Sequence, residues 1–257
     1  MPEALAIANQ KGGVGKTTTA VTLAQALTLQ GRRVLLVDLD PQGHVATALG
    51  VEKADGLYRL LVDQAPLPAV VQPARPNLDI LPSNKRTEAA KRHLTTVDFR
   101  ERALAEALRE APYDLILLDC APSFDVLHVA ALMASDFLII PTRLDHLAID
   151  GVNELLASVG QVRQMGGRAE LAGILPTFFD RQTRETAEQM RSLADAFGAY
   201  VWPPIPQDTR AREAPAYGQT LLEYAPRSTA VMGYPGEHEV RIGGYLASLA
   251  RLLAVLP

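Results

Sequence analysis

Short apolar runs alternate with longer stretches of mixed polar and apolar residues along the chain. The runs occupy residues 4–8, 34–37, 78–81, 115–118, 137–140 and 171–175. Continuous apolar runs of this length are typical of strands that are buried on both faces of a sheet. The stretches 16–30, 98–110, 146–165 and 183–197 are long enough for helices between these strands. The alternation predicts βαβ units, so we expect an α/β fold with a wound, mostly parallel sheet flanked by helices.

The size of the chain allows one large domain. It has 257 residues, of which 48% are hydrophobic, enough to bury a substantial core. The proline-containing stretches at 66–76 and 203–215 are short and interrupted by apolar residues, so we expect a single domain over residues 1–257. Lys11 interrupts the apolar segment at the N-terminus, which therefore does not have the pattern of a signal peptide. We expect a soluble, cytoplasmic protein.

Cysteine content and charge exclude some classes of protein. The single cysteine, Cys120, excludes an intramolecular disulfide and a cysteine metal cluster. The net charge of −4 argues against a protein coated with positive charge. A local basic patch can still bind nucleic acid, so any DNA site must come from geometry.

Residues 11–18 read KGGVGKTT and lie between the first predicted strand and the first predicted helix. Glycines let this loop turn with positive φ and bring its N–H groups close to phosphate oxygens. A helix that begins at Lys16 adds its positive dipole end, the lysine reaches the terminal phosphates, and the Thr17 hydroxyl can bind Mg²⁺. The pattern is a variant of the P-loop, because Gln10 stands where the first glycine is usual. We expect phosphates to bind at Gly12, Gly13, Val14, Gly15, Lys16, Thr17 and Thr18.

Two other predicted strands end in carboxylates. One reads VLLVDLDPQGH, with Asp38 at its end and Asp40 just beyond, and another reads YDLILLDCAPS, with Asp119 at its end. Ligands bind beyond the carboxyl ends of strands in such sheets. We therefore expect Thr17, Asp38 and Asp119 at a Mg²⁺ site and Asp40 as the residue that orients the attacking water. The alternative is turn formation before Pro41 for the first two aspartates and a helix cap for Asp119.

These motifs resemble those of the deviant Walker A ATPases, the group that contains the ParA/Soj partition proteins, MinD and nitrogenase iron protein. The resemblance implies ATP/ADP and Mg²⁺ as cofactors and catalytic roles for Lys11, Lys16 and Asp40. It makes Lys11 the signature lysine, which crosses a dimer interface to contact the partner's nucleotide. The chain departs from the family at His44, where asparagine is usual, and at Ala121, where proline is usual.

The same resemblance suggests where the adenine binds. It places the base near Pro206, Gln207 and Asp208, although arginine and asparagine are usual at 207 and 208. Contacts through backbone groups would survive this difference, whereas contacts through side chains would depend on it.

Two segments near the C-terminus resemble the chromosomal ParA/Soj branch. Residues 209–218 read TRAREAPAYG and residues 223–228 read EYAPRS, similar to the VRLSEAPSxG and EYDPRS segments of that branch. The resemblance implies that Arg210 binds DNA without sequence preference, which suits a side chain that reaches phosphates. Arg181, Arg184 and Arg227 are further DNA candidates. The commoner fate of a surface arginine is a solvated position or an intramolecular ion pair.

The resemblance as a whole implies a DNA partitioning (segregation) ATPase. Mg·ATP would lock a sandwich homodimer that binds double-stranded DNA non-specifically, hydrolysis would release the DNA, and a ParB-type centromere-binding protein would stimulate turnover. We expect a nucleoid-associated location and no membrane binding. Three alternatives stay open: a membrane-associated positioning ATPase like MinD, a ParA-like ATPase that positions a protein cargo, and an enzyme that couples ATP to amidation or electron transfer.

The last segment of the chain bears on the membrane alternative. Within residues 241–256, Tyr245, Leu249, Leu252 and Leu256 have helical spacing. A membrane-surface helix would carry more basic residues, so we expect this helix to pack on the core.

Overall fold

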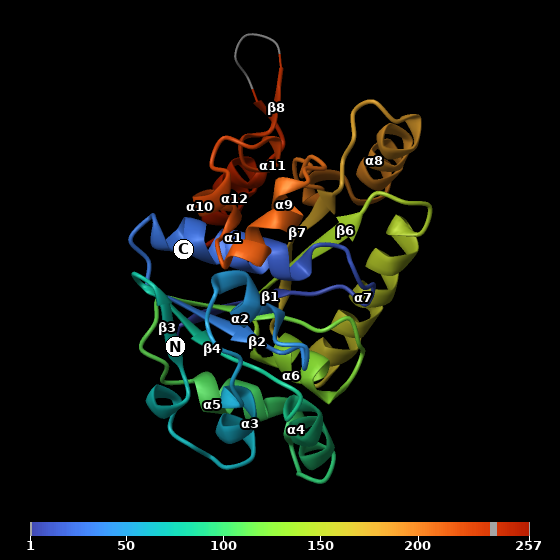
Figure 1. Cartoon of the computed structure of the whole chain (residues 1–257). Helices are drawn as coiled ribbons and strands as arrows, with labels where there is room; N and C mark the ends of the chain where they lie inside the picture. The colour runs from blue at the N-terminus through green and yellow to red at the C-terminus, as the bar shows by residue number, and fades with distance from the viewer. Residues whose placement is uncertain (1, 237–240, 257) are drawn as a thin grey trace.

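The computed structural model describes residues 2–236 and 241–256 and is built around one seven-stranded sheet (Figure 1). The strand order is β3-β4-β2-β5-β1-β6-β7. Neighbouring strands are parallel, except that β3 runs antiparallel to β4. The predicted wound, mostly parallel sheet is confirmed. The strands are β1 (Glu3–Ile7), β2 (Val34–Asp38), β3 (Gln72–Arg75), β4 (Leu78–Leu81), β5 (Leu115–Asp119), β6 (Phe137–Arg143) and β7 (Glu170–Thr177).

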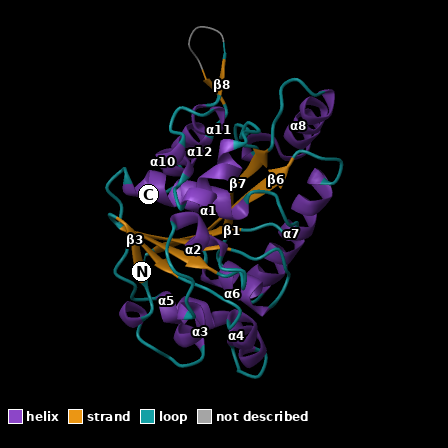
Figure 2. Ribbon diagram, in the orientation of Figure 1, coloured by secondary structure: helices purple, strands orange, loops and turns teal. Residues whose placement is uncertain are grey.

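Helices cover both faces of the sheet (Figure 2). One face carries α1, α2 and α10 to α12, and the other carries α3 to α7, with α8 beside α7. The helices are α1 (Lys16–Thr28), α2 (His44–Leu49), α3 (Gly56–Leu61), α4 (Thr87–Leu94), α5 (Ala103–Leu108), α6 (Val126–Ala134), α7 (Ala148–Gln164), α8 (Arg184–Phe197), α9 (Arg210–Glu213), α10 (Leu221–Tyr224), α11 (Thr229–Met232) and α12 (Tyr245–Leu253). A short hairpin, β8 (Tyr234–Pro235) and β9 (Arg241–Ile242), precedes α12.

The strands are apolar throughout because both of their faces are buried. In β1, Ala4 and Ala6 belong to the core on one face of the sheet, whereas Leu5 and Ile7 belong to the core on the other. Every residue of β2 and of β5 is buried. This double burial explains why the apolar runs lack the alternation of a half-exposed strand.

Three expectations from the sequence need correction. The predicted helix over 98–110 is interrupted, because Phe99 has a left-handed backbone (φ 55°) and a 3₁₀ turn, Arg100–Arg102, follows it before α5. Strand β3 was not predicted, since it is an edge strand of mixed composition that contains a proline. The segment 241–256 starts as strand β9 rather than as helix. Its helix α12 does pack on the core as expected, with Tyr245, Leu249 and Leu252 buried.

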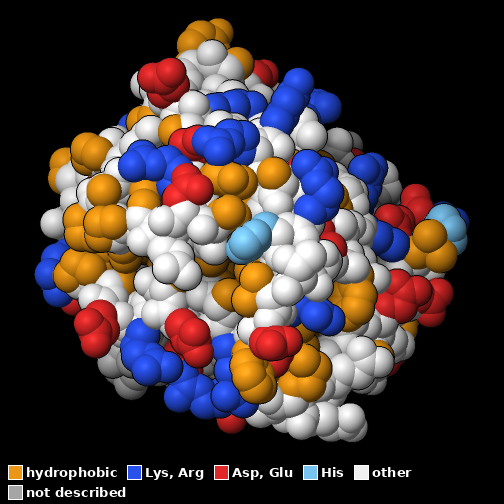
Figure 3. Space-filling model, turned by 90° about the horizontal axis from the view of Figure 1, so that it is seen from below, with side chains coloured by type: hydrophobic (Ala, Val, Ile, Leu, Met, Phe, Trp, Pro, Cys, Tyr) orange, Lys and Arg blue, Asp and Glu red, His pale blue; other side chains and the backbone are white. Residues whose placement is uncertain are grey.

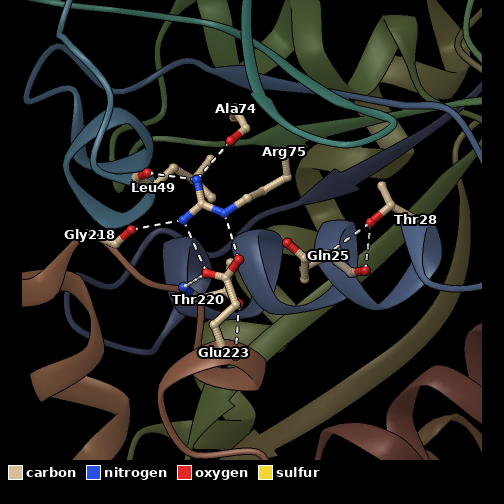
Figure 4. A network of polar contacts seen from close by, with 8 residues as sticks. All are labelled: Gln25, Thr28, Leu49, Ala74, Arg75, Gly218, Thr220 and Glu223. Carbon is tan, nitrogen blue, oxygen red and sulfur yellow. Dashed lines mark hydrogen bonds and ion pairs between the residues drawn. The ribbon is translucent and has the colours of Figure 1, made fainter.

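Arg75, on the edge strand β3, joins three segments that are far apart in the sequence (Figure 4). Its guanidinium donates to both carboxylate oxygens of Glu223 in α10, at 2.6 and 3.0 Å. It also donates to the backbone carbonyls of Leu49 at 3.0 Å, at the end of α2, and of Gly218 at 2.8 Å. Glu223 closes a capping box with Thr220 at the start of α10. Arg75 therefore links the end of α2, which follows the Asp40 turn, to residues 218–223, which follow the helix that begins at Arg210.

Backbone packing reinforces this junction. Gly50 and Gly218 both have left-handed backbones, with φ of 66° and 63°. A Cβ on Gly218 would lie 2.6 Å from the Gly50 Cα, so only glycine lets the two turns approach this closely.

We predict that Arg75→Met lowers the free energy of unfolding by about 2–4 kcal/mol, because it leaves a partly exposed Glu223 carboxylate and three carbonyls without their donor. Chemical denaturation measures this change. The matched control is Arg33→Met, since Arg33 is paired with Asp114 at a more exposed site and should leave the unfolding midpoint nearly unchanged. Equal midpoint shifts in the two variants would contradict the role given to Arg75.

Candidate nucleotide site

The loop between β1 and α1 has the geometry of a phosphate cradle. Gly13 and Gly15 have φ of 71° and 90°, and α1 begins directly after the loop at Lys16. Open space surrounds the positions where Gly12 and Gly13 would carry a Cβ. Because α1 has 13 residues, its N-terminus adds the partial positive charge of a full helix dipole. The loop can therefore bind an anionic group through its backbone N–H groups.

Lys16 places its ammonium across this loop. Its Nζ donates to the Lys11 carbonyl at 2.8 Å, and the residue is buried. Burial lowers the pKa of Lys16, while the nearby carboxylate of Asp119 acts in the opposite direction. A buried cation at the mouth of an anion site is well placed to neutralise phosphate charge.

Asp119 offers an oxygen for which the described residues provide no hydrogen-bond partner. Its Oδ2 accepts a hydrogen bond from the Thr17 hydroxyl at 2.7 Å, whereas its buried Oδ1 has no partner. Burial raises the pKa of Asp119 to about 7. A hydroxyl and a carboxylate oxygen beside a phosphate loop are the ligands that Mg²⁺ prefers, so Thr17 and Asp119 fit a magnesium ion.

Asp38 lies beside Asp119 but is bonded differently. The two residues are register partners on the parallel strands β2 and β5. The Asp38 carboxylate accepts from the backbone N–H of Asp40 at 3.0 Å and of Val45 at 3.1 Å. Burial, followed by the charge of Asp119, raises the pKa of Asp38 well above its ordinary value. These bonds favour a role in anchoring the turn that carries Asp40, and the role of Asp38 as a metal ligand stays a prediction.

Asp40 is half-buried on the turn after β2. Its Oδ1 accepts from the Gln42 N–H at 2.9 Å, and its carbonyl accepts from the Ser83 hydroxyl. Its charge acts on the pKa of both Lys16 and Asp119, which places it at the same edge of the sheet. His44 begins α2 and lines a crevice of about 220 Å³ together with Thr17 and Thr18.

Lys11 forms an ion pair outside its own phosphate loop. Its Nζ lies 3.2 Å from the Asp145 carboxylate, in the connection between β6 and α7, and both side chains are about 30% exposed. The aliphatic part of Lys11 lies along Gly151, where an added Cβ would be 3.5 Å from the Lys11 Cε. Asp145 also accepts from the Leu147 N–H, so this acceptor is fixed.

A cavity of about 180 Å³ lies beside the phosphate loop at the ends of β6 and β7. Pro206, Gln207 and Asp208 line it together with Gly15 and Thr18, and adenine binding there stays a prediction. Phe178, which directly follows β7, also lines it, together with Arg143, which the sequence did not single out. The Arg143 guanidinium lies 5.0 Å from the centre of the Phe178 ring, and Phe178 has a positive φ of 57°. The segment 175–180, which contains Phe178, ends a predicted strand, where a base is expected if phosphates bind at the end of the first strand.

The four arginines predicted to bind DNA are all exposed. Two of them have a partner described below, an ion pair for Arg210 and an aromatic ring for Arg181. Arg210 donates from Nε and Nη2 to the two carboxylate oxygens of Asp208, at 2.7 and 2.8 Å. Arg181 lies over the Tyr234 ring at 4.9 Å. Arg184 is the first residue of α8, and Arg227 follows α10.

His128 on α6 is a buried polar residue that the sequence did not single out. Within residues 2–236 and 241–256, neither of its ring nitrogens has a hydrogen-bond partner, and its ring lies 5.4 Å from that of Phe124. Burial lowers the pKa of His128 to about 4, so the ring is neutral near pH 7.

Comparisons with known proteins agree on one family. A model described as an AAA domain matches residues 2–171. The chromosome-partitioning ATPase Soj of Thermus thermophilus is 41% identical over 239 residues, which cover 92% of each chain. The sporulation initiation inhibitor protein Soj of Bacillus subtilis is 37% identical over 91% of this chain and 96% of its own. The chain belongs to the ParA/Soj family of partitioning ATPases.

A solved structure adds the cofactors. The crystal structure of cobyrinic acid a,c-diamide synthase from Mycobacterium smegmatis with bound ADP and magnesium has a TM-score of 0.75, at 35% identity, over 85% of this chain and 92% of its own. ParA/Soj membership and the geometry of residues 11–18 together make this chain an ATPase whose cofactors are ATP/ADP and Mg²⁺. The bound metal would neutralise phosphate charge, and Lys16 and the loop N–H groups are the groups of this chain that would hold the phosphates.

Proposed function

We propose that this ParA/Soj-family chain, acting as a single ATPase domain over residues 1–257, partitions DNA by a nucleotide-controlled dimer. Mg·ATP binding would close a sandwich homodimer, the dimer would bind double-stranded DNA non-specifically, and hydrolysis would release it. The observation that carries the proposal is the position of Lys11. Its ammonium pairs with Asp145 rather than entering the loop of its own chain, so it can be exchanged onto the nucleotide of a second copy at small cost. The matched relatives include a chromosome-partitioning ATPase.

The nucleotide site supplies the catalytic groups of this scheme. Lys16 and Lys11 would stabilise the charge that develops on the phosphates, and Asp40 would orient the attacking water. Thr17 and Asp119 would hold Mg²⁺, with Asp38 near them. The adenine would occupy the cavity lined by residues 206–208.

DNA binding would arise from the paired surfaces of two protomers. Arg210, Arg181, Arg184 and Arg227 would contact phosphates, and dimerisation would double their number. The protein surface carries basic and acidic side chains side by side, as the face drawn in Figure 3 shows. A surface of mixed charge binds DNA weakly, so the proposal makes DNA binding depend on the dimer. A ParB-type centromere-binding protein is the partner that the family implies, and a nucleoid-associated location in the cytoplasm follows from DNA binding.

A MinD-like function at a membrane is less well supported. Among the helices of residues 2–236 and 241–256, none combines the length and apolar character needed to span a bilayer. The C-terminal helix α12 uses its apolar side to pack on the core beside α1. It therefore does not offer that side to a lipid surface.

ATP-dependent amidation is the second candidate, because a similar solved structure carries the name of an amide-forming synthase. An enzyme that releases ammonia from glutamine with a thiol needs a reactive cysteine. The single cysteine of this chain, Cys120, is buried, and burial raises the pKa of its thiol. The site therefore favours hydrolysis over amidation, and the absence of glutamine consumption in the presence of ATP would exclude the second candidate.

We predict that Lys11→Ala abolishes ATP-dependent dimerisation, because the triphosphate in the interface loses the cation from the second copy. Sedimentation with and without Mg·ATP measures this effect. The control is Asp145→Asn, which removes the partner of Lys11 within the chain but keeps the lysine, and should still dimerise. An ATP-dependent dimer of Lys11→Ala would reject the crossing role.

We predict that Asp40→Ala still dimerises with ATP but hydrolyses it about 100-fold more slowly or worse, since the water loses its orienting carboxylate. Phosphate release from the dimeric fraction is the measurement. Turnover at the wild-type rate would remove Asp40 from catalysis.

We predict that Arg210→Glu weakens ATP-dependent DNA binding and reduces the slope of log affinity against log salt by about one per protomer, the value for one lost phosphate contact. The control, Arg33→Glu, makes the same charge change just before the first residue of β2. This position lies at the amino ends of the parallel strands, whereas the nucleotide site lies at their carboxyl ends. Equal losses in the two variants would mean that net charge, rather than the Arg210 site, determines binding.

A further inference from the structure

The guanidinium of Arg210 is already engaged by a carboxylate of its own chain. Asp208 Oδ1 accepts from Arg210 Nε at 2.7 Å, and Oδ2 accepts from Nη2 at 2.8 Å. This two-pronged arrangement is the one in which arginine also binds a phosphate. A DNA phosphate and the Asp208 carboxylate would therefore compete for the Nε and Nη2 donors of Arg210.

The carboxylate is the fixed member of this pair. The Asp208 side chain is 3% exposed, whereas that of Arg210 is 45% exposed. Asp208 Oδ2 also accepts from the Thr229 hydroxyl at 2.9 Å and from the Ala230 N–H at 3.4 Å, at the start of α11. Although burial opposes ionisation, the hydrogen bonds from Arg210 and Thr229 keep the pKa of Asp208 below its usual value. The bonds from Thr229 and Ala230 thus hold the carboxylate in place when the arginine moves.

We propose that Asp208 competes with DNA phosphate for Arg210 and so determines how strongly this site binds DNA. The inference rests on the proposed DNA-binding role of Arg210. A phosphate that approaches must either displace the guanidinium from Asp208 or bind its remaining N–H groups within reach of a buried like charge. Either route weakens the contact relative to an unpaired arginine.

Asp208 also lies next to the proposed nucleotide site. The same residue lines the cavity beside Gly15 and Thr18, where the proposed base would bind. One carboxylate therefore stands between the nucleotide cavity and the DNA candidate, so its effect on DNA must be measured with nucleotide saturating.

The test compares Asp208→Asn with the matched variant Glu213→Gln. Glu213 is the last residue of α9, the helix that begins at Arg210. Its carboxylate accepts from the Tyr224 hydroxyl rather than from Arg210. Each variant loses one negative charge, but only Asp208→Asn opens the two-pronged pair. Affinity for a random-sequence DNA duplex is measured over a range of salt concentrations at saturating Mg·ATP. The dimer fraction is determined by sedimentation under the same conditions.

We expect Asp208→Asn to bind DNA about three- to five-fold more tightly than the wild type per protomer, the range for a partly exposed ion pair. Glu213→Gln should gain less, and Arg210→Ala in the Asp208→Asn background should remove the gain. Weaker binding by Asp208→Asn, or a gain that persists without Arg210, would overturn the inference. If Arg210→Ala alone leaves DNA binding unchanged, the proposed function of Arg210 fails instead.

A second variant keeps the inference testable if Asp208→Asn does not fold. Arg210→Lys keeps the positive charge but cannot form the two-pronged bond. We expect it to retain DNA affinity close to that of the wild type. Lysine loses the two-pronged bond to a phosphate, but it also loses the two-pronged bond to Asp208, so the two effects offset each other. A loss as large as that of Arg210→Ala would contradict competition.

Discussion

Two carboxylates buried at the ends of neighbouring parallel strands are the constraint around which the site is built. The register of β2 and β5 places Asp38 beside Asp119, where burial disfavours the charge of both. The two carboxylates differ in their hydrogen-bond partners. Asp38 receives two backbone N–H groups from the turn that follows it, whereas Asp119 receives one hydroxyl and keeps an oxygen free. The first arrangement fixes backbone, and the second leaves a ligand for a cation.

The consequence is that the proposed catalytic role of Asp40 and the turn-anchoring bonds of Asp38 belong to residues that look alike in the sequence. Asp38 holds the turn on which Asp40 stands, so the orientation of Asp40 depends on a neighbour that need not touch the nucleotide. The turn leads into α2, whose end is held by Arg75 together with Gly218. The Arg75 side chain and the close approach of Gly50 to Gly218 therefore join the end of α2 to the segment that follows Arg210.

Features with a local signature were predictable from the sequence, whereas those that depend on tertiary neighbours were not. The apolar runs gave the parallel strands, and the glycines before Lys16 gave the phosphate loop, because both follow from short-range geometry. Lys11 was identified as the signature lysine, but its partner Asp145 lies 134 residues away in the sequence. No spacing rule joins such residues. Phe99 interrupted a predicted helix with an αL backbone although it is 73% exposed, and its sequence neighbours gave no sign of this.

Lys11 and Arg210 share a design that composition cannot reveal. Each is a cation with a proposed role in binding an anion from another molecule, and each is held by a carboxylate of its own chain. Pairs that are partly exposed contribute little to stability, about 1 kcal/mol or less, so a nucleotide or a DNA phosphate can replace the carboxylate. The pair nevertheless restricts a long side chain to one position before its ligand arrives. An acidic protein can in this way carry ordered cations at its binding surfaces, and the affinity of each surface is then determined by how firmly the carboxylate is fixed.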